Sequence, residues 1–200
     1  MTPYRSLVMV GIVALLAGCA ASDDGDGEVA EDDDDGNVET SSDAIAVAGR
    51  WKIPADVRAA GARATLSYDD APVWGSRPCA GNLQAGSLRL KSRLNGLFDA
   101  QISQIQGYAC RRNTASSSRM SVHGTGRALD IFIPKASGGA DNTKGDAVAN
   151  YLVKNAQELG IQLVIWDRTR WMTRRGEAAY SGPHPHDDHI HAELTDEAAR

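Results

Sequence analysis

Apolar side chains recur with a helical period in two segments of the chain. The segment 87–100 places Leu90, Leu94, Leu97 and Phe98 on one helical face, with basic residues opposite. The segment 146–159 repeats this pattern with its own apolar face of Val148, Tyr151, Leu152, Ala156 and Leu159. A cap-like Thr143-x-x-Asp146 pattern precedes it and Gly160 follows it. Both segments are predicted to be surface helices that pack on a sheet.

Other apolar segments are short or alternate with polar residues, which is typical of β-strands. The strands are expected at 128–133, 161–166 and 189–194, with weaker candidates at 64–68 and 101–108. Pro134, Gly160 and the Pro-containing segment 183–185 bound the three stronger ones. Helices and strands do not alternate regularly, so the pattern favours an α+β fold: a small, mainly antiparallel sheet with flanking helices. We find no internal repeat and no second folded domain.

The N-terminal residues 1–19 have the features of a secretory signal. A basic flank at Arg5 precedes an apolar run of about ten residues, which is too short to span a bilayer. The run ends in Leu-Ala-Gly-Cys at 16–19, which resembles a bacterial lipobox whose lipidated residue is Cys19. The alternative is an ordinary signal with an incidental cysteine. With Ala20 after Cys19, we expect an exported protein anchored by lipid to the cell envelope, in the outer membrane if the cell is Gram-negative.

Charge divides the remaining chain into two parts. Residues 20–49 carry eleven acidic residues and no Lys or Arg, which predicts a disordered linker. Residues 50–200 carry 20 basic and 15 acidic residues, a net charge of +5, and are long enough for one domain. This charge favours an anionic partner such as the cell-wall polymer, but it also fits a merely soluble surface. We expect no nucleic-acid partner.

Only two cysteines, Cys79 and Cys110, lie outside the signal. In an exported protein two cysteines form a disulfide more often than they bind a metal, and no close Cys-x-x-Cys pair is present. We therefore expect a Cys79–Cys110 disulfide.

All five histidines lie in two short segments, 121–130 and 184–191. His123 and Asp130 flank a glycine-containing turn, whereas His189 and His191 are two residues apart and so share one face of a strand. Two neighbouring strands can then present two histidines and an aspartate to one metal ion, and this ligand set suits zinc. The alternatives are a buried His–Asp pair for the first segment and a surface metal-scavenging segment for the second.

The two motifs together resemble the M15 family of zinc D-alanyl-D-alanine peptidases. Ser-x-His-x-x-Gly-x-Ala-x-Asp at 121–130 matches its first motif, and Asp-His-x-His at 188–191 matches its second. That family shares its fold with lysostaphin-type endopeptidases and the hedgehog domain. The wider stretch from Trp51 through Gly107-Tyr108-Ala109-Cys110-Arg111 to Leu194 is similar to exported bacterial and fungal domains within or near the family.

The resemblance implies a role for seven residues. His123, Asp130 and His191 correspond to the metal ligands. Asp188 matches an acidic residue that accepts a proton from the attacking water, and His189 one that orients or protonates the reacting group. Arg111 matches a residue that stabilises the oxyanion or a substrate carboxylate, although Arg112 beside it is an alternative. His186 matches a further active-site histidine, and His184 matches none.

We therefore expect a metallopeptidase with one zinc ion per chain that hydrolyses an amide bond in peptidoglycan stem peptides or crosslinks, as a D,D-carboxypeptidase or an endopeptidase. The first alternative is a non-catalytic, zinc-containing cell-wall-binding module of the same fold. A second alternative is metal storage or sensing by the histidine-rich segment.

Overall fold

The computed structural model describes residues 50–200, so the predicted signal, Cys19 and the acidic segment 20–49 lie outside the described residues. The helices are α1 (Ala55–Gly61), α2 (Ala85–Leu97), the 3-10 helix η1 (Val122–Thr125), α3 (Asn142–Lys154), α4 (Ala156–Leu159) and α5 (Asp196–Ala199). The strands are β1 (Gln104–Gln106), β2 (Ala128–Phe132), β3 (Ile161–Trp166), β4 (Thr169–Met172), β5 (Gly176–Ala179) and β6 (His189–Leu194). Among these residues, no helix has the length and apolar character needed to cross a membrane.

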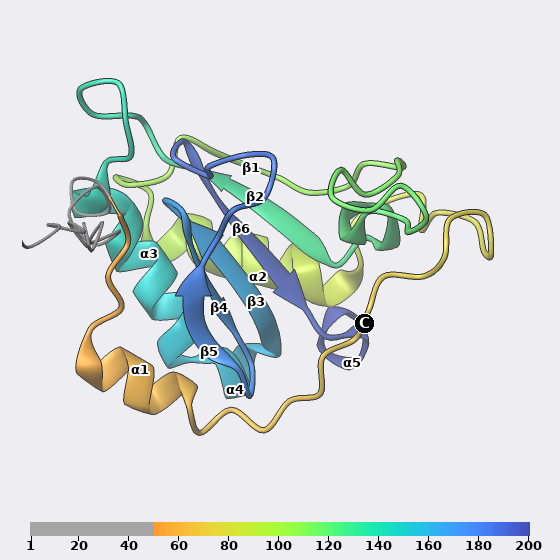
Figure 1. The fold of residues 1–200 in the computed structure, drawn as a ribbon, viewed down its shortest axis with the longest axis horizontal. Helices are drawn as coiled ribbons and strands as arrows, with labels where there is room; N and C mark the ends of the chain where they lie inside the picture. The colour runs from red at the N-terminus through yellow and green to blue at the C-terminus, as the bar shows by residue number, and fades with distance from the viewer. Residues whose placement is uncertain (1–49) are drawn as a thin grey trace, which may run out of the picture. The chain divides into compact units, whose positions relative to one another are not determined.

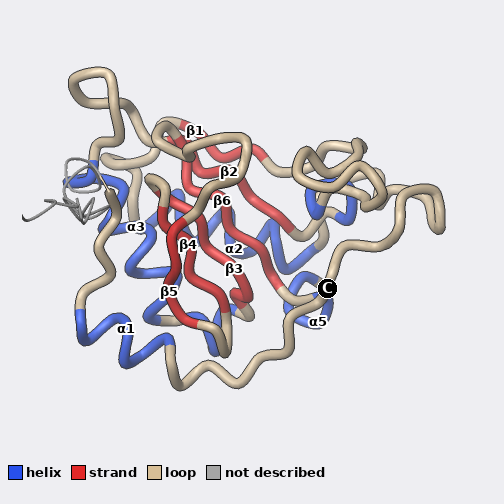
Figure 2. Tube along the Cα trace, in the orientation of Figure 1, coloured by secondary structure: helices blue, strands red, loops and turns tan. Residues whose placement is uncertain are grey.

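The strands form one antiparallel sheet in the order β1-β2-β6-β3-β4-β5 (Figure 1). The chain therefore has an α+β fold, as the sequence predicts. Figure 2 shows α2 and α3 behind the sheet, and both helices contact its strands. The candidate site lies on the opposite face of the sheet, over β2, β6 and β3.

The three stronger strand predictions are confirmed as β2, β3 and β6. The helix predicted at 87–100 is confirmed as α2, although it ends at Leu97 and leaves Phe98 just beyond it. The helix predicted at 146–159 begins earlier, at Asn142, because the side chain of Asp141 accepts a hydrogen bond from the Lys144 amide and caps it. It is also interrupted at Asn155, between α3 and α4, before Gly160 ends α4 in the left-handed conformation.

The strand predicted at 64–68 is wrong, and the one predicted at 101–108 is reduced to β1. Residues 64–68 are irregular because their backbone groups bond to side chains and not to a neighbouring strand. The Thr65 amide donates to Gln157 Oε1 at 2.8 Å, and the hydroxyl of Thr173 donates to the Leu66 carbonyl at 3.1 Å.

Three tryptophans are among the largest buried side chains of the main core. Trp51, Trp166 and Trp171 are at most 2% exposed. The indole N–H of Trp166 donates to Asp146 of α3 at 2.9 Å. A side chain at Gly145 would meet the Trp166 ring at 2.1 Å, so only glycine lets α3 approach the sheet this closely. Burial of these rings holds the helices against one face of the sheet. It therefore helps to fix the strand register that positions the site on the other face.

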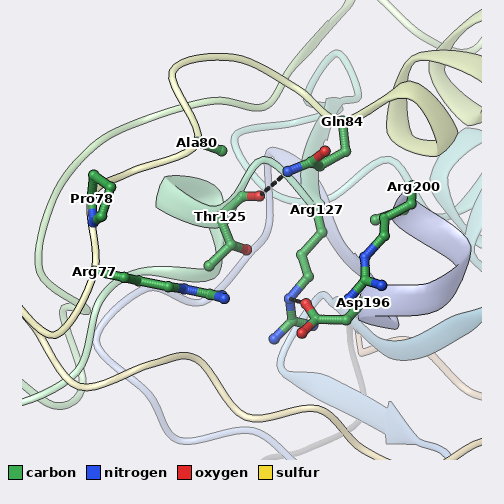
Figure 3. Close-up of a pocket in the computed structure, with 9 residues that line it drawn as sticks. Arg77, Pro78, Ala80, Gln84, Thr125, Arg127, Asp196 and Arg200 are labelled. Carbon is green, nitrogen blue, oxygen red and sulfur yellow. Dashed lines mark hydrogen bonds and ion pairs between the residues drawn. The ribbon is translucent and has the colours of Figure 1, made fainter.

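Arg127, the residue before β2, connects three parts of the chain. Its guanidinium donates to the carbonyls of Leu194 and Asp69, and its Nε lies 3.0 Å from the Asp196 carboxylate. Figure 3 shows this pair in a hollow that Arg77 and Gln84 also line. Because Arg127 is already paired within the chain, we interpret this hollow as structural.

The predicted disulfide is present. Cys79 and Cys110 are bonded, with their Cα atoms 5.7 Å apart. The bond joins the segment before α2 to the loop that carries Arg111 and leads into η1, where His123 lies.

Candidate metal centre

Strand pairing and the turn after η1 bring the three predicted metal ligands together. Asp130 of β2 pairs directly with His191 of β6, so their side chains leave the same face of the sheet. His123 comes from η1, which ends at Gly126 in the left-handed conformation with φ +72°. A side chain at Gly126 would also lie 2.3 Å from the Asn82 carbonyl. This glycine therefore lets the chain turn sharply from His123 into the strand that carries Asp130.

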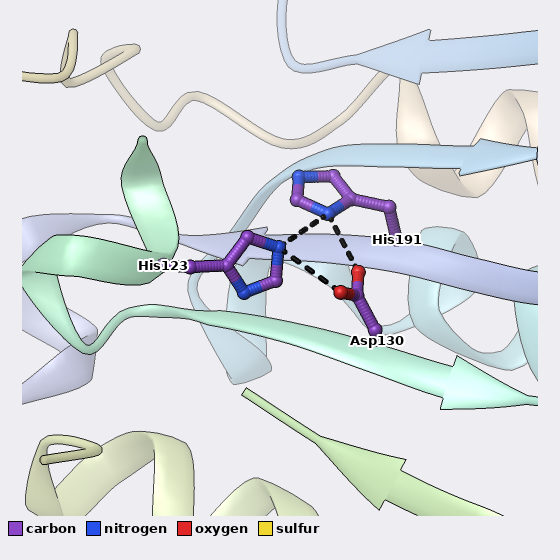
Figure 4. Close-up of side chains that lie close together, drawn as sticks. All are labelled: His123, Asp130 and His191. Atoms are coloured by element: carbon purple, nitrogen blue, oxygen red, sulfur yellow. Dashed lines mark hydrogen bonds and ion pairs between the residues drawn. The ribbon is translucent and has the colours of Figure 1, made fainter. Parts of the chain in front are cut away.

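The ligand atoms of this trio converge (Figure 4). Nε2 of His123 lies 3.2 Å from Nδ1 of His191 and 3.2 Å from Oδ2 of Asp130. Nδ1 of His191 lies 3.0 Å from Oδ1 of Asp130. These residues form a possible His/Asp/His metal-binding group.

The other nitrogen of each imidazole is held by an acceptor. Nδ1 of His123 donates to the carbonyl of Gly107, and Nε2 of His191 donates to Oε1 of Glu193 at 3.1 Å. With these protons in place, neutral imidazoles turn their lone pairs toward each other and toward the Asp130 carboxylate. Three acceptors at such short distances repel one another unless a proton or a metal ion lies between them. The residues present therefore fit a bound metal ion, with the outer contacts that metal-binding histidines usually have.

Charge at the trio also favours a cation. Burial disfavours the charged form of Asp130, but hydrogen bonds with His123 and His191 outweigh it and hold the pKa of Asp130 well below its usual value. Burial also disfavours the charged form of His191, but its contacts with Asp130 and Glu193 raise its pKa to about 9. The two carboxylates thus stabilise positive charge here, which a proton or a metal ion can supply.

Glu193 was not identified from the sequence, although its position two residues after His191 places it on the same strand face. Its carboxylate is buried, and Oε2 accepts hydrogen bonds from Gln162 at 3.1 Å and Tyr68 at 3.2 Å. Burial and the adjacent Glu193 raise the pKa of Tyr68, so the phenol stays protonated and donates. No sequence signal marked Tyr68, Gln162 or Gly107 as part of this network.

His189 and Asp188 form a second pair beside the metal group. Nδ1 of His189 lies 2.6 Å from Oδ1 of Asp188, and Nε2 lies 3.9 Å from Oδ1 of Asp130. The ring of His189 packs on Phe132, with centroids 5.2 Å apart. Burial acts against charge on Asp188, but the hydrogen bond with His189 outweighs it and lowers the pKa of Asp188. Asp188 itself does not line the cleft, so it approaches the metal group through His189.

His186 lies on the other side of His189, with ring centroids 4.8 Å apart. Burial, followed by the nearby His191 and His189, lowers the pKa of His186 to about 4, so it is neutral at pH 7. Its Nδ1 donates to the His184 carbonyl at 2.8 Å, which leaves Nε2 as an acceptor. His184 also lines the cleft, so all five histidines of the chain gather at one site.

A cleft of about 260 Å³ opens over these groups, and two arginines line it. Arg111 is one of them. Arg112 is not, because its guanidinium stacks on Trp74 at 5.0 Å and donates to the Ser117 carbonyl at 2.7 Å. The second cleft arginine is Arg170 of β4, which the sequence did not single out.

Comparison with known proteins gives one family. No curated protein and no solved structure matches the chain. Residues 79–191 match the family described as VldE, C-terminal domain. The matched segment contains both histidine motifs, the disulfide and the whole metal-binding group. Since it spans more than half of the 200 residues, this chain belongs to the VldE C-terminal domain family.

Proposed function

We propose that this protein is a zinc-dependent peptidase that hydrolyses an amide bond in peptidoglycan stem peptides or crosslinks. The observation that carries the proposal is the convergence of His123, Asp130 and His191 at the floor of an open cleft. Tetrahedral zinc with ligands at about 2.0–2.1 Å requires ligand atoms about 3.3 Å apart. The three separations of 3.0–3.2 Å are close to that value.

The paired motifs support the same assignment, since they resemble those of the M15 zinc peptidases. An antiparallel sheet with helices on one face is compatible with the fold that those enzymes share with the hedgehog domain. The predicted signal and Cys19 add the expectation that the protein is exported and anchored to the cell envelope by lipid.

When bound, zinc supplies a Lewis acid that polarises the scissile carbonyl and makes water more acidic. His189 then accepts a proton from the attacking water through Nε2, and Asp188 orients its ring through Nδ1. The same histidine returns the proton to the leaving amine. Arg111 donates to the oxygen that becomes negatively charged as the carbonyl is attacked. Neutral His186 accepts a hydrogen bond from the substrate or from water beside His189.

The test measures zinc content and cleavage of a muropeptide panel by the purified protein. We expect one zinc per chain in the wild type and its loss in His191→Ala. Asp188→Asn should keep zinc but lower kcat by about 10- to 100-fold, because His189 loses the charge that orients it. The matched control is Asp187→Asn, since Asp187 pairs with Lys135 at 3.1 Å outside the cleft.

Three results contradict the proposal in different ways. If zinc remains in His191→Ala, the ligand set is wrong. Stoichiometric zinc without cleavage of any muropeptide indicates the non-catalytic wall-binding module instead. More than one zinc per chain, with no effect of His123→Ala, indicates metal storage by the segment 184–191.

A further inference from the structure

Strand pairing places Arg170 in the same row of the sheet as the metal group. Asp130 pairs with His191, His191 pairs with Ile165 of β3, and Ile165 pairs with Arg170 of β4. Residues paired in this way point to the same face of a sheet. Strands lie about 4.8 Å apart, so the Arg170 backbone is about 10 Å from that of His191. Its long side chain lies over the same cleft as the metal group.

The surface between the metal group and Arg170 is apolar. Leu163, Ile165 and Met172 form a small cluster of buried side chains on this face, and Tyr180 packs against them. They line the cleft as well. A substrate that extends from the metal group toward β4 therefore crosses an apolar floor before it reaches a guanidinium group.

Arg170 has no ionic partner in the folded chain. Across residues 50–200, no carboxylate lies within ion-pair distance of its guanidinium. The cleft carboxylates Asp130 and Glu193 are already occupied by histidines. By comparison, Arg174 on the same hairpin donates to the Thr65 carbonyl at 2.5 Å. Arg170 is thus free to bind an anion that enters the cleft.

We propose that Arg170 determines specificity by binding a carboxylate of the substrate, one or two residues from the scissile amide. The inference rests on the proposed function, because the metal group defines where that amide lies. An extended peptide advances about 3.3 Å per residue, and the arginine side chain spans the rest of the distance. The carboxylate belongs either to the peptide's C-terminus or to an acidic side chain, and both suit the planar guanidinium.

Binding of uncleavable ligands tests this independently of catalysis. The probes are ketomethylene analogues of acetylated D-alanyl-D-alanine with a C-terminal carboxylate or a carboxamide. A third analogue ends in D-glutamate with a C-terminal carboxamide, so that its carboxylate is on the side chain. Dissociation constants are measured by calorimetry on zinc-loaded wild type, Arg170→Gln, Arg111→Gln and Arg175→Gln. Arg175 is exposed and lies outside the cleft, which makes it the matched control.

We expect the wild type to bind one of the two carboxylate probes about tenfold more tightly than the uncharged probe, a modest factor because Arg170 is exposed to solvent. The ratio should approach one in Arg170→Gln and persist in Arg175→Gln. Whichever carboxylate probe binds more tightly identifies the source of the charge. The inference is overturned if the wild type binds none of the probes, if it does not distinguish them, or if only Arg111→Gln abolishes the preference. Loss of the preference in Arg170→Gln supports it even if no peptide is cleaved, and that last result counts only against the proposed function.

Discussion

Replacing Glu193 by glutamine tests whether the buried network behind the metal group sets its affinity. Oε1 of Glu193 holds Nε2 of His191 at 3.1 Å, and Oε2 is bonded by Gln162 and Tyr68. Glutamine has nearly the same shape, so the cavity stays filled. It carries no charge, however, and its amide nitrogen can only donate. At least one of the three contacts must therefore face the wrong partner, and His191 loses the carboxylate that makes it a stronger ligand.

Loss of such an outer contact weakens metal binding by about 10- to 100-fold. Glutamine still offers one acceptor, so we expect the lower end, about tenfold in the zinc dissociation constant. Competition with a chromophoric chelator at pH 7 measures this constant. Glu197→Gln is the matched control because Glu197 is exposed on α5, away from the metal group. Thermal unfolding with saturating zinc checks that both variants fold.

The reasoning is refuted if Glu193→Gln binds zinc as tightly as the wild type while His191→Ala does not bind it. Glu193 would then be a buried polar residue with no influence on the ligand. A large loss of stability in saturating zinc, without a change in zinc affinity, would assign Glu193 a purely structural role.

Four further outcomes are expected. Burial raises the pKa of Asp167 to about 6, so the folded protein binds this proton more tightly than the unfolded chain, and stability falls as pH rises from about 4 to 6. Asp167→Asn should therefore raise the free energy of unfolding by about 2 kcal/mol at pH 7 and change it little at pH 4, as measured by urea unfolding; an equal effect at both values contradicts the assignment. Replacing both Cys79 and Cys110 by serine opens a loop of 31 residues and should cost about 3–4 kcal/mol in the same assay, whereas no loss would show that the loop is already ordered in the unfolded chain. Gly126→Ala should cost more than about 2 kcal/mol, because the left-handed backbone and the Asn82 carbonyl both exclude a Cβ, and an unchanged melting temperature would argue against this turn. Removing metal with a chelator should lower the melting temperature, and added zinc should restore it; equal melting curves would argue against a bound ion.

Period-two alternation was sufficient to predict the strands that carry the ligands. It placed His189 and His191 on one face, and the structure adds Glu193 at the next position of that face. Pairing of Asp130 with His191 depends on strand order, which a local pattern does not encode. The resemblance between motifs supplied that long-range information for the ligands alone.

Elements without a strong period were missed. The hairpin β4–β5 contains Arg170 and a mixture of polar and small residues, so no alternation marked it as part of the sheet. For this reason the sequence did not mark Arg170 as a residue of the candidate site. Asp188 illustrates the limit of spacing: it is three residues before His191, and on an extended backbone an odd separation directs side chains to opposite faces. Its contact with His189 through a side-chain hydrogen bond is visible only in three dimensions.

The arrangement around the trio favours a metal site over a buried His–Asp pair. In a neutral structural pair, the single imidazole proton lies on the nitrogen that faces the carboxylate. Here both histidines direct their outer nitrogens to acceptors, Gly107 for His123 and Glu193 for His191, so their protons are used away from the centre. A second buried carboxylate next to His191 would be costly if its only task were to fill space, because burying a charge carries a large desolvation penalty. Positive charge at the centre offsets that cost, and a divalent cation does so more fully than a proton on His191 because its larger charge stabilises both carboxylates at once. The outer shell of this site is therefore stronger evidence for a metal than the number of histidines.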